Sequence, residues 1–382
     1  MDAQATPEIL RVLNDVPDPR RHNVRHKLID ILTLALIGVI CGADDWVTVV
    51  TYARAKEAWL RTFLELPCGI PSHDTFGRVF ARLDPAAFEQ AFLKWVSALV
   101  DLSGGKLVAI DGKSIRRSFE NAWDKAGMAH LVSAFVTANS LVFAQIKTDG
   151  KGQELDAVQK LLTSLDLKGA VVSIDAIGCN THIAGLIIKA KADYILPVKG
   201  NQPTLEAKLQ TLFAEAELEG FKGYKSDTHQ TVDGNHGRIE TRKIAVLWDV
   251  KLLGALAGDW PGLRCMARLQ RTREVPGPGG MQSSTEQQYY VLSLDARSNA
   301  RTIMSYIRQH WGVENQLHWQ LDVSFREDER RIRVGHGAEN FSRLNRMALN
   351  LLKNEPTRKV GVATSRKRCG WDNDYLLKVL AP

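Results

Sequence analysis

The chain of 382 residues is 45% hydrophobic and 24% charged, the balance of an ordinary soluble globular protein with room for two or three domains. Its longest apolar run, residues 31–41, is too short to span a bilayer, so a buried helix explains it better. The formal net charge of +7 suits a polyanionic partner but does not prove one.

The cysteines and the first residues bear on the cellular compartment. The five cysteines are scattered, with no Cys-x-x-Cys spacing, which argues against a disulfide framework and against a zinc site. The first seven residues lack the basic-then-apolar pattern of a secretory signal. Both observations fit a reducing cytoplasm.

Residues 1–100 are predicted to form a helical domain. Residues 28–41 are apolar on all sides and should form its central helix. Residues suited to cap a helix precede three further predicted helices: Asp44 or Asp45, Ser72, and Asp84 followed by Pro85.

Basic residues in this domain leave its role open. Residues 18–27 form a basic lead-in that either touches phosphates or is a solvated arm. Arg78 and Arg82, on the helix that Ser72 caps, suit a DNA-binding head. A plain helical scaffold or a dimerisation domain would show the same spacing.

The first candidate acid ends an apolar run. Residues 107–110 are apolar and lead into Asp111, and Gly112 then breaks the run. A short apolar run bounded by glycine is typical of a strand buried on both faces. A lone Asp-Gly pair more often only starts a turn, but here the pattern recurs.

The recurrence lies at residues 169–178, where a second apolar run ends in Asp175. Two neighbouring parallel strands would place Asp111 and Asp175 at one edge of a sheet. Paired carboxylates of this kind supply the hard oxygen ligands suited to two divalent cations such as Mg²⁺ or Mn²⁺.

The rest of residues 101–202 alternates strand and helix. Further strands are predicted at residues 130–137, 141–147 and 194–198, and helices at residues 155–165 and 180–192. A hairpin turn is predicted at Asn139 and Ser140.

Two polar features in this region have competing explanations. Glu154 opens a helix, where the helix dipole favours an acid anyway, and this explanation is preferred to a role in a site. Lys199, Asn201 and Gln202 follow the last strand and either bind phosphate oxygens or bases or simply form a turn.

Residues 203–295 are predicted to be an insertion, because far more chain separates Asp175 from the next candidate acid than a core helix pair needs. It should contain a helix at residues 205–219 and strands at residues 236–246, 263–270 and 287–294, with a loop at 276–280. Four residues there are candidate DNA contacts: His229, His236, Arg238 and Arg242. A zinc site on the two histidines is disfavoured because cysteine partners are lacking.

The next candidate acid is Glu314, on a helix predicted at residues 302–321. The apolar stripe of this helix places Glu314 in the middle of the side that faces the core. An unpaired buried carboxylate is costly, so Glu314 needs a partner, which a metal shared with Asp111 and Asp175 would provide. The competing explanation is a salt bridge to a nearby basic residue: Arg308, His310 or His318.

The C-terminal part is rich in basic residues. Residues 325–333 are predicted to form a solvated loop with Arg330, Arg331 and Arg333 available for DNA. A final core helix is expected at residues 338–353. Residues 356–382 are expected to be a loosely ordered basic tail with non-specific phosphate contacts.

Asp111, Asp175 and Glu314, in this order, resemble the acidic triad of DDE transposases with a ribonuclease-H-like core. More closely, the chain resembles the ISAs1-type insertion-sequence transposases, also known as H-repeat-associated proteins. The matching stretches run from about residue 18 to about residue 353: residues 18–21 (Asp-Pro-Arg-Arg), 71–76 (Pro-Ser-His-Asp-Thr-Phe), 109–113 (Ala-Ile-Asp-Gly-Lys), 198–202 (Val-Lys-Gly-Asn-Gln), 236–242 (His-Gly-Arg-Ile-Glu-Thr-Arg), 310–315 (His-Trp-Gly-Val-Glu-Asn) and 318–323 (His-Trp-Gln-Leu-Asp-Val).

The resemblance implies an α/β fold with a ribonuclease-H-like mixed sheet flanked by helices. The expected parts are an N-terminal helical domain (1–100), the first part of the catalytic core (101–202), a β-rich insertion (203–295), the second part of the core with the Glu314 helix (296–355) and the basic tail (356–382).

The resemblance also implies a reaction, a cofactor and partners. The expected enzyme cleaves and joins DNA by two-metal phosphoryl transfer, with Mg²⁺ on Asp111, Asp175 and Glu314 and no covalent protein–DNA intermediate. The expected partners are double-stranded DNA and further copies of the chain, as a dimer or higher multimer, in the bacterial cytoplasm at the nucleoid and away from membranes. The residues expected to bind DNA are Lys113, Arg116, Lys199, Asn201, Gln202, Arg238, Arg242, His310, Asn315, Arg330 and Arg333.

Two alternatives stay open. An inactive or domesticated DNA-binding relic would keep the fold, but its signature, a lost triad acid, is not found in this sequence. A ribonuclease-H-like nuclease that cuts without joining strands is the second alternative. The long insertion and the helical head favour transposition.

Overall fold

The computed structural model describes residues 7–22, 24–102, 104–118, 128–148, 152–235, 237–277 and 280–381. The chain divides into two compact units. The first unit comprises Met1–Asp101, Gly112–Ala157 and Val313–Pro382, and the second comprises Leu102–Asp111 and Val158–Gly312.

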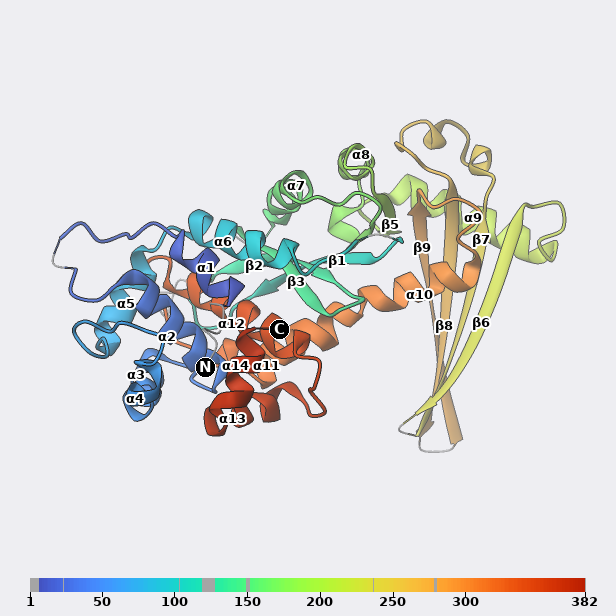
Figure 1. Cartoon of the computed structure of the whole chain (residues 1–382). Coiled ribbons are helices and arrows are strands. Elements are labelled where there is room, and N and C mark those ends of the chain that lie inside the picture. Colours follow the sequence, from blue (N-terminus) through green and yellow to red (C-terminus); the bar gives the residue numbers. More distant parts are fainter. Residues whose placement is uncertain are drawn as a thin grey trace. The chain divides into compact units, whose positions relative to one another are not determined.

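The N-terminal part of the first unit is helical, as predicted (Figure 1). Its helices are α1 (Glu8–Asn14), α2 (Leu28–Ile40), α3 (Trp46–Ala55), α4 (Glu57–Leu60), α5 (His73–Arg82) and α6 (Pro85–Ser97). The predicted caps are confirmed, because three side chains accept hydrogen bonds from backbone N–H groups of the first turn: Asp45, Ser72 and Asp84. Helix α2 is almost wholly buried. Among the described helices, none has both the length and the apolar composition needed to cross a bilayer.

The same unit holds a β-hairpin and a second group of helices. Strands β2 (His130–Val136) and β3 (Leu141–Thr148) pair antiparallel. Ser140 in the predicted turn has a φ of 56°, in the left-handed region that tight hairpin turns use. The later elements are a π turn η4 (Glu314–His318), α11 (Trp319–Val323), a 3₁₀ turn η5 (Glu327–Glu329), α12 (Gly337–Asn354), α13 (Val362–Trp371) and α14 (Asn373–Leu380).

Helix α12 is the predicted final core helix, and it is tied to the N-terminal helices. It packs against α2, α5 and α6, and it carries Arg343 and Arg346, both fully buried. Arg343 pairs with Glu89 of α6 and Arg346 with Glu327 at 3.0 Å. Because a buried guanidinium must be paired, these contacts fix α12 against its neighbours.

The prediction of a loosely ordered basic tail is wrong, because α13 and α14 occupy most of residues 356–382. Arg366 is buried and donates hydrogen bonds to the carbonyl oxygen of Val39 at 2.8 Å and to the carboxylate of Asp44 at 3.1 Å. Arg366, one of the basic residues that suggested a solvated tail, is therefore held in the interior of the unit.

The second unit is built on parallel strands. Strand β1 (Leu107–Ser114) pairs parallel with β4 (Val171–Ile174), and β4 pairs parallel with β5 (Asp193–Val198). Helix α7 (Glu154–Ser164) precedes β4, and α8 (Thr181–Lys189) joins β4 to β5. Helix α10 (Ala300–His310) contributes Ile303, Met304 and Ile307 to the apolar core of this unit.

Four antiparallel strands continue the sheet beyond β5. They are β6 (Ser226–Asn235), β7 (Arg238–Leu247), β8 (Cys265–Gly277) and β9 (Gly280–Leu292), and they form long ribbons in Figure 1. The complete strand order is β3-β2-β1-β4-β5-β9-β8-β7-β6. The first five positions are the ribonuclease-H order, so the predicted fold class is confirmed.

The predicted insertion is β-rich, but it differs in detail from the expectation. Helix α9 (Pro203–Leu218) leads into it, and β9 pairs with β5, so the insertion extends the core sheet. The sequence did not predict β6, whose mostly polar residues lack an apolar alternation. His236 and residues 278–279 of the predicted loop lie outside the described residues.

Candidate active site

Asp111 and Asp175 lie at corresponding positions on two neighbouring parallel strands. Ile110 of β1 is paired with Ile174 of β4. Asp111 is the next residue of β1, and Asp175 directly follows the last residue of β4. Both side chains are partly buried. The prediction that the two acid-bearing strands are neighbours is therefore confirmed, and adjacent strands lie about 4.8 Å apart.

The turn that holds Asp175 is locally constrained. The Asp175 carboxylate accepts a hydrogen bond from the backbone N–H of Ile177 at 3.2 Å. A Cβ atom on Gly178 would lie 2.4 Å from the Cγ2 atom of Ile174, so only glycine fits there without a shift. The chain thus folds back tightly over the end of β4.

Asn201 and Gln202 bind this turn from the loop after β5. The side-chain amide of Asn201 donates to the carbonyl oxygens of Ala176 at 2.7 Å and Cys179 at 3.1 Å. The amide of Gln202 also donates to Cys179, at 3.1 Å. The NH₂ groups of both amides thus hold the Asp175 turn in this structure, and their predicted DNA contact stays a prediction.

His310, at the end of α10, contacts β4 next to the candidate site. Its Nδ1 lies 2.8 Å from the hydroxyl of Ser173, which faces the same side of the sheet as Asp175 because the two residues are two apart. Burial lowers the pKa of His310 to about 4. A neutral imidazole at pH 7 cannot contact a DNA phosphate as a cation, so the structure does not support the DNA-binding role predicted for His310.

We expect His310 to make stability depend on pH. The pKa of His310 is lower in the folded protein than the usual 6.5. As the pH falls, His310 therefore becomes protonated in the unfolded chain at a higher pH than in the folded protein. Stability should therefore decline from about pH 6.5 to about pH 4, by at most about 3 kcal/mol from this residue. Urea unfolding at pH 7 and pH 4.5 measures this decline.

A comparison of two histidine variants isolates the contribution of His310. His310→Gln should lose less stability between the two pH values than the native chain. His182→Gln, at an exposed histidine of the same unit, should behave as the native chain does. Equal losses in the two variants would contradict the assignment.

Lys113, expected to bind DNA, is buried with 8% of its surface exposed. Its ammonium lies 2.7 Å from the carboxylate of Asp322 and 3.1 Å from that of Asp328. β1 continues past Asp111, and these two ion pairs occupy the Lys113 ammonium, so the structure does not support the DNA contact predicted for Lys113.

Glu314 does not lie where the helical stripe predicted. It is exposed, whereas Leu317 and Leu321 are buried. Residues 314–318 form a π turn, and Val313 rather than Glu314 is the buried residue at its start. Such turns are frequent at functional sites.

The arginines expected to bind DNA differ in what they contact. Arg330 is largely buried, donates to Asn345 at 2.8 Å and lies over the ring of Phe341 at 4.1 Å, so its predicted DNA contact is not supported. Arg333 donates to the carbonyl oxygen of Arg117 at 3.1 Å. Arg116 keeps 80% of its side chain exposed.

The remaining candidates lie on the surface of the second unit or near the π turn. Arg238 is exposed on β7, and Arg242 pairs with Asp233 and Glu240. Lys199 and Asn315 are exposed. Arg238, Lys199 and Asn315 are therefore accessible at the surface, whereas Arg242 is largely buried in its ion pairs.

A chain of close polar contacts that follows Asp111 in the sequence was not predicted. The hydroxyl of Ser114 lies 2.7 Å from His130 Nδ1, and His130 Nε2 lies 2.6 Å from Glu154. A Cβ atom on Gly112 would lie 2.9 Å from His130 Nε2, so glycine makes room for the pair. Glu154 does start a helix as predicted, but its partner is 24 residues earlier and no spacing signalled it.

The donor atoms at the two strand ends fit a divalent cation. Carboxylate oxygens are the preferred ligands of Mg²⁺ and Mn²⁺. In the parts of the chain that the structure describes, no group of three or more His, Cys, Asp or Glu side chains gathers into a metal site. Two carboxylates alone would leave such an ion short of protein ligands.

Two family models match the chain. The model described as "DDE_Tnp_1-associated" matches residues 10–96, and the model described as "Transposase DDE domain" matches residues 102–351. The second match contains Asp111, Asp175 and Glu314.

Full-length relatives carry corresponding names. "Putative transposase YncI" of Escherichia coli O157:H7 is 38% identical over 98% of this chain and 94% of its own length. "H repeat-associated putative transposase YhhI" of Escherichia coli K12 is 35% identical over 98% of both chains. A piggyBac transposase synaptic complex with hairpin DNA covers 99% of this chain and 80% of its own, with a TM-score of 0.39 and 11% identity, a similarity too low to establish a shared fold.

Proposed function

The chain belongs to the DDE transposase family, among the H-repeat-associated proteins of ISAs1 type, and from this premise we propose which residues carry the reaction. Enzymes of this type use divalent metal ions. We propose that the ion is Mg²⁺, with Mn²⁺ as a substitute, and that Asp111, Asp175 and Glu314 hold it.

The observation that carries this proposal is the register of β1 and β4. Because Ile110 pairs with Ile174, Asp111 and Asp175 follow at matching positions on adjacent strands. Two carboxylates at this separation can share a cation, and neither is deeply buried.

Two features support Glu314 as the third ligand. Glu314 follows His310 by four residues, about one helical turn, and His310 contacts Ser173 two residues before Asp175. Lys113, two residues after Asp111, is paired with Asp322, eight residues after Glu314. Each contact thus joins a residue close in sequence to Glu314 with a residue close in sequence to one of the two aspartates.

The proposed division of labour follows from these positions. The bound ion supplies a Lewis acid for the attacking hydroxyl and the leaving oxygen of a phosphodiester. The three carboxylates serve as ligands, so no serine or tyrosine nucleophile is required. Lys113 and the Asn201 amide keep the ligand-bearing segments in place.

The same proposal extends to partners. We propose that the substrate is the double-stranded DNA of the two element ends and of a target, bound by a dimer or higher multimer of this chain in the bacterial cytoplasm. Arg116, Lys199, Arg238 and Asn315 keep exposed side chains suited to such contacts.

Removing the Asn201 amide should weaken catalysis through Asp175. Asn201→Ala deletes two hydrogen bonds to the turn at residues 176–179, and a small misplacement of a ligand should lower the cleavage rate about tenfold. The rate should be measured at increasing Mg²⁺, where a looser site shows a higher metal requirement. Lys199→Ala, two residues earlier, is the control and should leave that requirement unchanged; an equal shift in both variants would assign the effect to DNA contact instead.

Cleavage and strand transfer on labelled element-end DNA test the function itself. The DNA flanking the coding sequence supplies the ends, and reactions contain Mg²⁺, Mn²⁺ or a chelator. We expect cut and joined products only with a metal ion. DNA binding without cutting under every condition would mean that the protein is an inactive DNA-binding relic. Cutting without joining would mean that it is a nuclease.

A further inference from the structure

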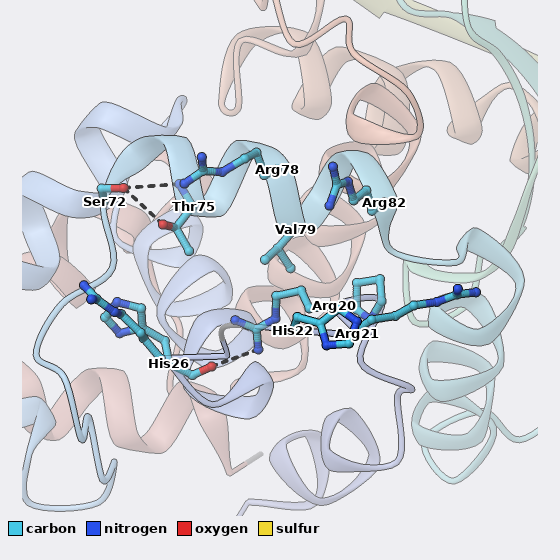
Figure 2. Close-up of a pocket in the computed structure, with 11 residues that line it drawn as sticks. Arg20, Arg21, His22, His26, Ser72, Thr75, Arg78, Val79 and Arg82 are labelled. Carbon is cyan, nitrogen blue, oxygen red and sulfur yellow. Dashed lines mark hydrogen bonds between the residues drawn. The ribbon is translucent and has the colours of Figure 1, made fainter.

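A basic cavity of about 880 Å³ lies in the first unit, between residues 19–26 and helix α5. Figure 2 shows α5 along one side, with Arg78 and Arg82 projecting from it, and Arg20, Arg21 and His22 along the other. Neither Asp111 nor Asp175 contributes to its lining.

The lining concentrates positive charge, and an acid compensates only part of it. It contains no Asp or Glu but includes five arginines: Arg20, Arg21, Arg25, Arg78 and Arg82. Within the described part of the chain, no carboxylate pairs with the last four of these, and all four are exposed. Such a cluster raises the local concentration of polyanions.

The fifth arginine fixes the shape of the segment. Arg20 binds the carboxylate of Asp18 through two nitrogens, at 2.8 and 2.7 Å, and donates to the carbonyl oxygen of His26 at 2.8 Å. These bonds hold Asp18, Arg20 and His26 together. The free arginines of this segment therefore project from a built structure, unlike the solvated arm that was one explanation of this sequence.

Helix α5 is equally well anchored. Ser72 caps it, and Phe76 and Phe80 are buried against the ring of Trp46, with centroids 5.8 and 4.6 Å from it. Arg78 and Arg82 are four residues apart, so they lie one helical turn apart on one side of α5. The helix thus presents two guanidinium groups in a row.

We propose that this cavity binds the sugar-phosphate backbone of duplex DNA, at a place separate from the metal-binding carboxylates. Guanidinium groups bind phosphate oxygens in bidentate fashion, and a row of them can follow a strand. The Nδ1 atom of His26 is buried, has no hydrogen-bond partner among the described residues and lines the same cavity. A small-molecule pocket would be mostly apolar, whereas here arginines predominate.

The inference rests on the proposed function in one respect, that DNA is the substrate. Phosphate contacts position DNA but do not read its sequence. The cavity should therefore contribute affinity for any duplex and hold DNA while another part of the chain cuts it.

A double variant tests the inference. Arg78→Ala with Arg82→Ala should raise the Kd of the full chain for a short fluorescent duplex about tenfold or more. The slope of log Kd against log salt should fall by about 2, because two phosphate contacts are lost. Fluorescence anisotropy at several NaCl concentrations gives both values.

The matched control removes the same charge elsewhere in the unit. Arg54→Ala with Lys367→Ala alters two exposed residues outside the cavity and should change the Kd less than about twofold. Equal effects of the two double variants would overturn the inference, because net charge alone would explain them. Inorganic phosphate that displaced the duplex at matched phosphate concentration would also overturn it, in favour of a site for free phosphate.

The cleavage assay separates this inference from the proposed function. If the double variant cuts at the native rate once DNA saturates it, both hold. If the native chain binds DNA through the arginines but never cuts, the cavity stands and the catalytic proposal falls. If cutting occurs and the double variant binds as tightly as the native chain, the cavity is not a DNA site.

Discussion

Replacing Asp175 with alanine should lower metal-dependent DNA cleavage by about a thousandfold or more. Asp175 follows the residue of β4 that pairs with Ile110, so its loss leaves Asp111 as the only strand-end carboxylate of the pair. With Asp111 and Glu314 alone the proposed ligand set is incomplete, so the cation is held weakly and the reaction loses its Lewis acid. The rate should be measured at saturating labelled duplex and several Mg²⁺ concentrations.

The control for this variant is Asp259→Ala, which changes an exposed aspartate of the same unit. It should cleave at the native rate. DNA affinity should stay within about twofold in both variants, because neither aspartate is proposed to contact phosphate directly. Cleavage by Asp175→Ala within about tenfold of the native rate would remove Asp175 from the catalytic residues.

The position of the two aspartates was predictable because the signal is local. Each follows a short apolar run and precedes a small residue, which marks the end of the buried apolar part of a strand. The order of strands and helices then limits the topology, because parallel strands need crossovers of one hand. Ile110 and Ile174 are paired as this reasoning requires.

The roles of the basic residues could not be predicted in the same way. Lys113 is paired with Asp322, 209 residues away, and Arg366 with Asp44, 322 residues away. Lysine and arginine are usually exposed. A sequence therefore suggests that such a residue lies at the surface unless the distant acid that pairs with it is known. The structure supplies those partners.

The position of Glu314 could not be predicted for a different reason. Its place on the apolar stripe assumed a regular helix of 3.6 residues per turn. The π turn at residues 314–318 breaks that period, and the composition of the segment does not predict such a turn. Strand β6 escaped prediction because its polar residues gain their stability from pairing with β7 rather than from burial.

Replacing Glu327 with alanine should destabilise the protein by about 3–5 kcal/mol. Glu327 is 1% exposed, and it accepts hydrogen bonds from Ser342 at 2.7 Å, from Asn345 at 3.0 Å and from Arg346 at 3.0 Å. The variant leaves the Arg346 guanidinium buried without its carboxylate, which costs more than the pair itself gains. Urea unfolding of the native and variant chains measures the difference.

The pH dependence gives a second measurement of the same network. Burial alone would raise the pKa of Glu327, but the charges of Arg346 and Lys113 and the hydrogen bonds outweigh it and lower the pKa to about 2. This pKa is below the usual 4.5, so as the pH rises the folded protein loses the Glu327 proton at a lower pH than the unfolded chain does. The stability that Glu327 contributes is therefore complete above about pH 4.5. It should disappear as the pH falls towards about 2. Glu327→Gln should lack this component of acid unfolding.

Glu329→Ala is the matched control, two residues away on the same 3₁₀ turn. Glu329 is exposed and pairs with Arg326 at the surface, where such a pair contributes less than about 1 kcal/mol. The two alanine variants should therefore unfold at clearly different urea concentrations. Equal midpoints would mean that the interior around Glu327 relaxes or admits water, and that the network with Arg346 does not hold α12 in place.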